Sequence, residues 1–349
     1  MTGHLGPKKR VTQQDIARMI GVSQATVSLV LNGRADGEVK IAPETRERVL
    51  QAIAETGYVA DPVARRLAAG RNRILGVFTY EPVFPSANSD FYHPFLTGME
   101  QRAEQLGCDL LLLTSVPVVD GHRRIFNEGN RLRLADGCVL LGRSLDPQEL
   151  ARLIAEELPF ASVGRRDDAG GPVPYVGADY PAVVASLVDR AVTLGHRRLA
   201  YIGDGDGPES YADRLRGFTT AAAAHGVDTV RERVADRGLD DVLGTVLAAG
   251  ATVLFVEEYA DAVPLVRAAR ARDLSVPGDL SVVTLGDPTR PASRIDLEFT
   301  GFRIPRAEMG SQAVDVLMAR IEGSGVAEQR LLPCEPVDGE TLTAPEREA

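Results

Sequence analysis

The first sixty residues place apolar side chains at the spacing of short α-helices. Thr12 stands three residues before Asp15, a spacing at which the two side chains can cap the start of a helix. Gly21 can adopt the positive φ of a sharp turn, and Ser23 can cap a second helix. The apolar face expected on the first helix consists of Ile16, Ala17, Met19 and Ile20. The pattern therefore predicts two short helices joined by a glycine turn, as in a helix-turn-helix.

In the second predicted helix, Val27, Val30 and Leu31 face back onto the first helix. The outward positions carry side chains that suit the major groove of DNA, namely Gln24, Ala25, Thr26, Ser28 and Leu29. A third amphipathic helix is predicted over residues 43–56. Any small helical hairpin can show this turn and spacing, so the motif alone leaves a purely structural role open.

Charge is divided unevenly along the chain. Residues 1–73 contain 12 Lys and Arg against 7 Asp and Glu, whereas the whole chain has a net charge of −10. A basic head on an acidic body is expected where only the head meets the phosphates of nucleic acid. The charge distribution therefore favours DNA binding by the head.

From residue 74 onward, apolar runs alternate with helical patterns. Strands are predicted at 74–79, 109–114, 137–141, 160–163, 199–202, 252–256 and 281–285. Helices are predicted between them at 94–106, 147–157, 180–194, 212–225 and 260–272. Continuous apolar strands separated by amphipathic helices predict parallel sheets that are covered on both faces. Because the pattern restarts near 174–179, we predict an α/β body of two doubly wound halves behind an all-α head.

Three stretches of the first 75 residues resemble the LacI/GalR family of bacterial transcription regulators. They read VTQQDIARMIGVSQATVSLVLNG from Val11, ETRERVLQAIAETGYVAD from Glu44 and VARRLAAGR from Val63. The likeness continues more loosely to about residue 330. It implies a ligand-responsive homodimeric regulator, a repressor of a palindromic operator in double-stranded DNA. It also implies a body like that of periplasmic binding proteins, in which a small metabolite such as a sugar closes a hinge.

The resemblance also implies domain boundaries. They are a helix-turn-helix head at 1–60, a hinge helix and linker at 61–73, and an effector-binding and dimerisation body at 74–349. The halves of the body are expected at roughly 74–175 with 296–325 and at 176–290 with 326–342.

For the head, the resemblance implies base contacts by Gln24, Ala25 and Leu29. Phosphate contacts are expected from Thr12, Ser23, Thr26, Ser28, Asn32 and Tyr58. In the hinge helix of residues 61–73, Leu67 is expected to insert into the minor groove with Ala64 packed beside it.

Two motifs of the second half match the family well. GHRRLAYIGD at 195–204 corresponds to the strand that opens this half, and SYADRLRGF at 210–218 corresponds to an effector-binding segment. The resemblance therefore implies that Ser210 and Arg214 bind effector, since a guanidinium donates hydrogen bonds in a planar fork.

Other pocket motifs depart from the family pattern. Phe91 and Tyr92 fall on two aromatic positions of a loop that is longer here, and are expected either to stack on a ligand or to belong to the core. Glu257 stands where the family has an asparagine. The family also has two adjacent aspartates, and this chain has Gly286 at the first of these positions and Asp287 at the second. Arg165 follows another strand; it is expected to meet an anionic ligand or to pair with Asp167 or Asp168.

The body shows no sign of catalysis. It lacks a Walker loop and a GxSxG elbow, and the glycines at 203–207 are not followed by Lys and Ser or Thr. Cysteines and histidines lack metal-ligand spacing, so neither a metal nor a cofactor is expected. Without a signal peptide or an apolar run of about 18 residues, we expect a cytoplasmic protein with no membrane contact.

Two other functions remain open at this stage. A sugar-binding transport or enzyme-like body would share the fold, but the head and the absence of a signal peptide argue against it. A constitutive DNA-binding regulator with a degenerate pocket is kept open by Glu257, Glu258 and Gly286. The last residues show no apolar period of 3.5, so we expect a dimer without a tetramer-forming coiled coil.

Overall fold

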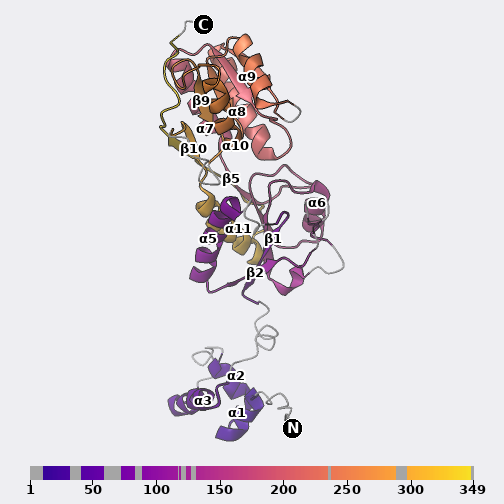
Figure 1. Cartoon of the computed structure of the whole chain (residues 1–349). Coiled ribbons are helices and arrows are strands. Elements are labelled where there is room, and N and C mark those ends of the chain that lie inside the picture. Colours follow the sequence, from indigo (N-terminus) through magenta and orange to yellow (C-terminus); the bar gives the residue numbers. More distant parts are fainter. Residues whose placement is uncertain are drawn as a thin grey trace, which may run out of the picture. The chain divides into compact units, whose positions relative to one another are not determined.

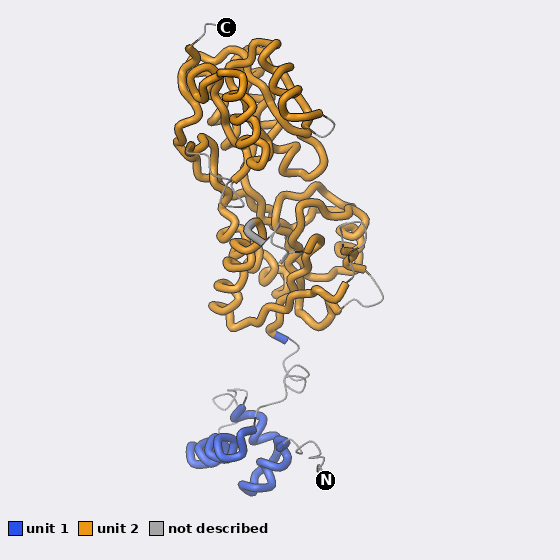
Figure 2. Tube along the Cα trace, in the orientation of Figure 1, with its two compact units in different colours: residues 1–72 blue, residues 73–349 orange. Residues whose placement is uncertain are grey.

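The computed structural model describes residues 11–31, 41–58, 72–82, 89–116, 118, 123–126, 131–234, 237–287 and 297–346. The chain divides into two compact units, residues 1–72 and 73–349 (Figure 2). Asn32, Ala64 and Leu67, three of the predicted DNA contacts, lie outside the described residues, as do residues 61–71 of the predicted hinge.

The first unit contains helices α1 (Gln13–Ile20), α2 (Gln24–Leu31) and α3 (Pro43–Thr56) (Figure 1). Thr12 and Asp15 form the expected capping box: the Thr12 N–H donates to Asp15 Oδ2 at 3.0 Å, and the Asp15 N–H donates to Thr12 Oγ1 at 3.2 Å. Gly21, with φ of 69°, turns the chain between α1 and α2. The predicted helix-turn-helix is therefore confirmed.

The core of the head is formed by small and branched side chains from all three helices, namely Ile16, Ala17, Val27, Val30, Val49 and Ala52. Met19 was predicted on the apolar face of α1 but is 60% exposed. Position 19 lies roughly 160° around the helix from the buried Ala17, so one stripe cannot bury both. That part of the prediction was wrong.

The body contains a six-stranded parallel sheet in the order β11-β5-β4-β3-β1-β2. Its strands are β1 (Ile74–Thr79), β2 (Asp109–Leu113), β3 (Gly137–Leu141), β4 (Phe160–Val163), β5 (Tyr175–Ala178) and β11 (Gln329–Leu332). Helices α5 (Ser89–Gln105) and α11 (Arg306–Ile321) pack together on one face, and α6 (Pro147–Ala155) packs on the other, near the short η2 (Leu132–Leu134).

A second parallel sheet has four strands in the order β7-β6-β8-β9. They are β6 (Arg198–Ile202), β7 (Asp228–Glu232), β8 (Val253–Val256) and β9 (Ser281–Thr284). Helices α7 (Tyr180–Thr193) and α8 (Glu209–His225) cover one face, and α9 (Leu239–Ala248) and α10 (Tyr259–Arg270) cover the other. An antiparallel pair, β10 (Gly301–Arg303) and β12 (Glu335–Val337), completes this half. The two parallel-sheet halves confirm the predicted fold class.

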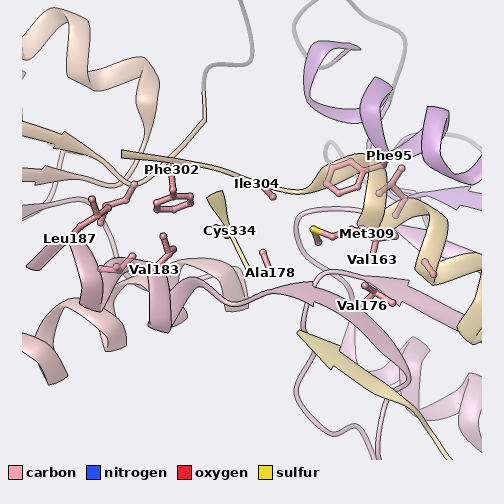
Figure 3. Close-up of a cluster of buried hydrophobic side chains, with 14 of the residues drawn as sticks. Phe95, Val163, Val176, Ala178, Val183, Leu187, Phe302, Ile304, Met309 and Cys334 are labelled. Atoms are coloured by element: carbon pink, nitrogen blue, oxygen red, sulfur yellow. The ribbon is translucent and has the colours of Figure 1, made fainter. Parts of the chain in front are cut away.

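Within the described residues, the chain passes between the two halves three times: after β5, between β10 and α11, and between β11 and β12. Ala178, Ile304 and Cys334 lie on these passages and belong to one buried apolar cluster (Figure 3). We call these three passages the hinge of the body.

The strand pairing corrects the predicted boundary between the halves. β11 pairs with β5, with Gln329 opposite Tyr175, at one edge of the six-stranded sheet. Residues 176–178 and 329–332 therefore lie in the first half, whereas the sequence assigned them to the second. Residues 300–303, which the sequence assigned to the first half, pair with the second half. The residues of these short strands do not indicate which sheet they join, because β11 pairs with a strand about 150 residues away in the sequence.

His196 attaches the C-terminal segment of the chain to the second sheet. The ring is buried, with Nδ1 2.8 Å from Thr252 Oγ1 and Nε2 2.8 Å from the carbonyl oxygen of Thr343. Burial lowers the pKa of His196 below its ordinary value, because a desolvated imidazolium is unfavourable. Folding therefore favours the neutral form of this ring.

We predict that the free energy of unfolding falls between pH 7 and pH 5, and that His196→Gln makes this fall smaller. The lowered pKa means that the unfolded chain binds the proton more readily, so the contribution of His196 is present above about pH 6.5 and is lost as the pH falls. One such group changes the free energy of unfolding by at most about 1.4 kcal/mol per pH unit. Urea denaturation of both proteins at the two pH values measures the effect, and identical pH dependences would contradict it.

Candidate functional site

The outward side of α2 carries the residues predicted to contact bases. Gln24 and Ala25 are exposed, and Leu29 is partly exposed. The Gln24 amide donates to Gln13 Oε1 at 2.8 Å, which ties its side chain to α1. α2 thus presents an amide, a methyl group and an apolar side chain to solvent.

The residues predicted to contact phosphate surround the starts of the helices. Thr12 is exposed at the start of α1, and the Thr26 N–H donates to Ser23 Oγ at 3.1 Å at the start of α2. Ser28 is partly exposed. Tyr58 follows α3 and is half-buried against the core of the head. The structure therefore leaves hydroxyl groups accessible at both helix starts, where backbone N–H groups favour anions.

A cavity, here called the main cavity, lies between the two halves of the body at the carboxyl ends of the strands. Parallel α/β sheets bind ligands at this end of their strands. Its described lining combines cations, carboxylates, hydroxyls and aromatic rings, including Phe91, Arg143, Tyr180, Ser210, Tyr211, Arg214, Glu258, Tyr259, Asp287 and Arg306. Such a mixture suits a polar, hydroxyl-bearing small molecule.

Most of the predicted effector residues come together here. Phe91, Ser210, Arg214 and Asp287 line the main cavity. Tyr92 and Arg165 line a neighbouring cavity that shares Phe91, Ser210 and Arg143 with it. Tyr92 itself is buried in the core and donates its hydroxyl to Glu81, so its ring belongs mainly to the core.

Arg214 is a buried cation of the main cavity. Its side chain projects from α8, and the residue is 6% exposed. Its Cζ lies 4.5 Å from the centre of the Tyr180 ring and 5.7 Å from that of Tyr211. Its Nε has no hydrogen-bond partner, and no carboxylate of the described residues lies within 4 Å of the guanidinium. Among the described residues the guanidinium therefore forms no ion pair, and Glu258 and Glu257 act on its charge only from a greater distance.

A second arginine of the cavity is neutralised within the protein. Arg306, at the start of α11, lies 2.7 Å from Asp287 Oδ2, which follows β9 in the other half. Its Cζ lies 5.1 Å from the centre of the Phe91 ring, and that of Arg143 lies 4.8 Å from the same centre. Phe91, for which stacking on a ligand was one expectation, thus contacts two guanidinium groups.

Two adjacent arginines join the halves beside the neighbouring cavity. Arg165 Nε lies 2.6 Å from Asp213 Oδ2, and Arg166 Nη1 lies 2.7 Å from Glu209 Oε2. The arginines follow β4 in the first half, and the carboxylates lie one turn apart on α8 in the second. We call these two ion pairs the arginine clasp.

The clasp decides between the two alternatives for Arg165. Its Nη1 also lies 2.5 Å from Asp167 Oδ1, so Arg165 pairs with Asp167, as one alternative held, and in addition with Asp213. Its Nε and Nη1 therefore both donate to carboxylates of the protein. A direct contact with an anionic ligand would require Arg165 to leave one of them.

Glu257 does not line either of the two cavities, which corrects its predicted role. Its carboxylate accepts the Tyr201 hydroxyl at 2.6 Å and the N–H groups of Asp204 and Gly205 at 3.0 and 3.1 Å. A Cβ at Gly203 would lie 2.4 Å from the Glu257 Cβ, so the glycine loop closes tightly over this side chain. Burial raises the pKa of Glu257, and these hydrogen bonds oppose the rise.

The length of its side chain explains why Glu257 does not line the cavity. Glutamate is one methylene longer than the asparagine expected at this position, and its carboxylate reaches backbone N–H groups that need an acceptor. The carboxylate that does line the cavity is that of Glu258, which accepts the Tyr211 hydroxyl at 2.7 Å.

Sequence reasoning missed several lining residues of the main cavity: Arg143, Tyr180, Tyr211, Glu258 and Arg306. Arg143 and Glu258 each come two residues after a strand, a position that could have identified them. Tyr180 and Arg306 begin helices just beyond the hinge, and no local pattern marks them.

Comparisons with known proteins agree with this arrangement. Residues 12–61 match the model described as "Bacterial regulatory proteins, lacI family", and residues 188–342 match that of a "Periplasmic binding protein-like domain". An uncharacterized HTH-type transcriptional regulator in the aml 5' region of Streptomyces limosus is 31% identical over 327 residues, which cover 88% of this chain and 87% of the relative.

Solved structures show the same fold. The lac repressor dimer bound to operator and the anti-inducer ONPF has a TM-score of 0.72 at 24% identity and covers 96% of this chain and 100% of its own. The CelR–cellobiose complex has a TM-score of 0.62 at 24% identity and covers 95% of this chain and 100% of its own.

The helix-turn-helix head and the two-halved body define a DNA-binding transcription regulator rather than an enzyme. The chain belongs to the LacI family of bacterial regulatory proteins. None of the described helices is long and apolar enough to cross a membrane.

We predict that Glu257→Ala lowers the free energy of unfolding by about 2–4 kcal/mol, because it leaves two N–H groups and a buried hydroxyl without their acceptor. Glu258→Ala is the matched control. It removes one contact at the cavity wall, where water can replace the carboxylate, and should lower stability by less than about 1 kcal/mol. Urea denaturation measures both, and equal losses would contradict the assignment.

The arginine clasp generates a second prediction. Glu209→Gln should lower the free energy of unfolding by about 1.5–3 kcal/mol, since Arg166 is 3% exposed and its bond to Glu209 is charge-assisted. Glu156→Gln removes a pair within one helix, in which Arg152 is 59% exposed, and should cost at most about 0.5 kcal/mol. A double-mutant cycle with Arg166 measures the coupling, and a value below that of the Glu156–Arg152 pair would refute the role of the clasp.

Proposed function

We propose that this protein is a repressor that binds a palindromic operator as a homodimer and changes its DNA affinity when a small metabolite enters the main cavity. The observation that carries the proposal is Arg214, a buried cation without an ionic partner among the described residues, in a cavity between two hinged halves. The solved relatives support it, since one is a repressor dimer bound to operator and another is a regulator bound to cellobiose.

On the DNA side, Gln24, Ala25 and Leu29 read base edges in this proposal. Thr12, Ser23, Thr26, Ser28 and Tyr58 hold phosphates, together with Asn32, which lies outside the described residues. The exposure of Gln24 and Ala25 and the accessible hydroxyls at the helix starts support these roles. Phosphate contacts set the register of α2, and base contacts supply specificity.

The dimer follows from the operator, because two heads reading a palindrome require two-fold symmetry. We place its main surface on the first half of the body, around α5 and β2. Strand β2 is an edge of the six-stranded sheet, and its Leu110, Leu111 and Leu112 are only partly buried in one chain. In this proposal the protein acts on its DNA partner in the cytoplasm.

Effector binding acts through the hinge in this proposal. A ligand of the main cavity contacts residues of both halves, so it favours one spacing of the halves over another. The arginine clasp and the Arg306–Asp287 pair span the same gap. Their ion pairs are the contacts that a change in spacing would have to break or keep.

A constitutive DNA-binding regulator is the second candidate function. Two observations favour it: Glu257 and Arg165, both predicted to contact ligand, bind partners within the protein. The unpaired charge of Arg214 favours the ligand-responsive function, since a pocket that had lost its ligand would gain stability by losing this charge.

We predict that Leu29→Arg changes base preference at one symmetric pair of operator positions. Leucine cannot form the bidentate contact that arginine makes with guanine, so the variant should gain a preference for guanine of about 1–3 kcal/mol at that pair. Selection of binding sites from a random DNA pool by both full-length proteins measures the change. Leu50→Arg, an exposed leucine of α3, is the matched control and should leave the selected site unchanged. An identical site for Leu29→Arg and the parent protein would show that Leu29 does not face the bases.

A further inference from the structure

We infer that the ligand of the main cavity carries an anionic oxygen group, a carboxylate or a phosphate, that binds between Arg214 and Arg143. This inference rests on the proposed function, because it names the chemical class of the effector. It also separates this chain from a regulator whose cavity is built for neutral hydroxyls alone.

The burial of Arg214 is the first argument. Proteins almost always pair a buried charge, because an unpaired one loses its hydration without compensation. Arg214 is 6% exposed, its Nε lacks an acceptor, and no described carboxylate lies within 4 Å. The Tyr180 and Tyr211 rings contact the guanidinium but supply no negative charge that balances it. An oxyanion of the ligand supplies that negative charge, and its oxygens accept hydrogen bonds from the planar fork of guanidinium N–H groups.

Arg143 provides a second cation on the same cavity. Its side chain is exposed, its guanidinium packs on Phe91, and no carboxylate of the described residues pairs with that guanidinium. Only its backbone N–H donates to a carboxylate, that of Glu81, at 3.2 Å. Both Arg143 and Arg214 lie close enough to Tyr211 to act on it electrostatically. Two cations that have no carboxylate of the described residues within 4 Å of their guanidinium groups therefore line the cavity, one from each half.

The remaining charges of the cavity do not cancel this pair. Arg306 and Asp287 neutralise each other at 2.7 Å, and Glu258 is the one carboxylate of the described lining without an ion pair. The described lining thus keeps an excess of one positive charge. Glu258 and Ser210 can bind hydroxyl groups, whereas Glu257 is turned away and Gly286 has no side chain. The arrangement fits a hydroxylated molecule with one acidic end.

The test uses the full-length protein and four probes at constant ionic strength: inorganic phosphate, D-glucuronate, D-glucose 6-phosphate and D-glucose. We expect phosphate to raise the thermal midpoint saturably, and at least one anionic sugar to bind ten-fold or more tightly than D-glucose by calorimetry. The tighter of the two anionic sugars identifies a carboxylate or a phosphate as the preferred group.

Variants assign the binding to these arginines. Arg214→Met should abolish protection by phosphate, and Arg143→Gln should weaken binding of the anionic sugar about ten-fold. Arg214→Lys keeps the charge without the fork and should retain part of the binding. Arg152→Gln, on the exposed side of α6, is the matched control and should bind as the parent protein does.

Three results would overturn the inference: no saturable protection by phosphate, equal affinity for D-glucose and both anionic sugars, or phosphate binding that survives Arg214→Met. A less stable Arg214→Met protein with unchanged phosphate binding would give Arg214 a structural role instead. A different result would contradict the proposed function: the tightest anionic probe binds through Arg214 and saturates the cavity, but the affinity for the operator does not change.

Discussion

The three chain passages that form the hinge hold the two halves so that the strands of both parallel sheets end at one cavity. The constraint comes from connectivity: β5, β11 and α11 belong to the first half, whereas their sequence neighbours α7, β12 and β10 belong to the second. The buried cluster around Ala178, Ile304 and Cys334 makes the passages part of the core rather than loose linkers (Figure 3). A hinge of this kind lets the halves change their spacing while their cores stay intact.

The charges of the body follow from that constraint. Side chains at the carboxyl ends of strands meet across the gap, so ion pairs such as Arg306–Asp287 and Arg166–Glu209 connect residues far apart in the sequence. Because these pairs are largely shielded from water, their electrostatic interaction is stronger than that of a surface pair. Arg214 is the exception, since it is as buried as they are but has no described carboxylate beside it.

Glu257 and Glu258 illustrate how neighbouring residues of one type can take different roles. The first fills the glycine loop at 203–207 with a carboxylate, which accepts hydrogen bonds from the N–H groups of Asp204 and Gly205. The second starts α10 at the wall of the main cavity. One residue of difference at the end of β8 turns one side chain into the core and the other toward the cavity.

The sequence alone determined the local elements and the family. The capping pair Thr12 and Asp15, the turn at Gly21 and the alternation of apolar runs with amphipathic helices depend on nearby residues, so their patterns could be read directly. Arg214, Ser210 and Asp287 could be placed at the cavity because they lie in recognisable motifs at strand and helix ends. Only the tertiary structure decided that β11 joins β5, that Glu257 turns inward, and that Arg165 pairs with Asp213. Each of these depends on a partner distant in the sequence, and the energy that selects it arises only when the chain has brought the two together.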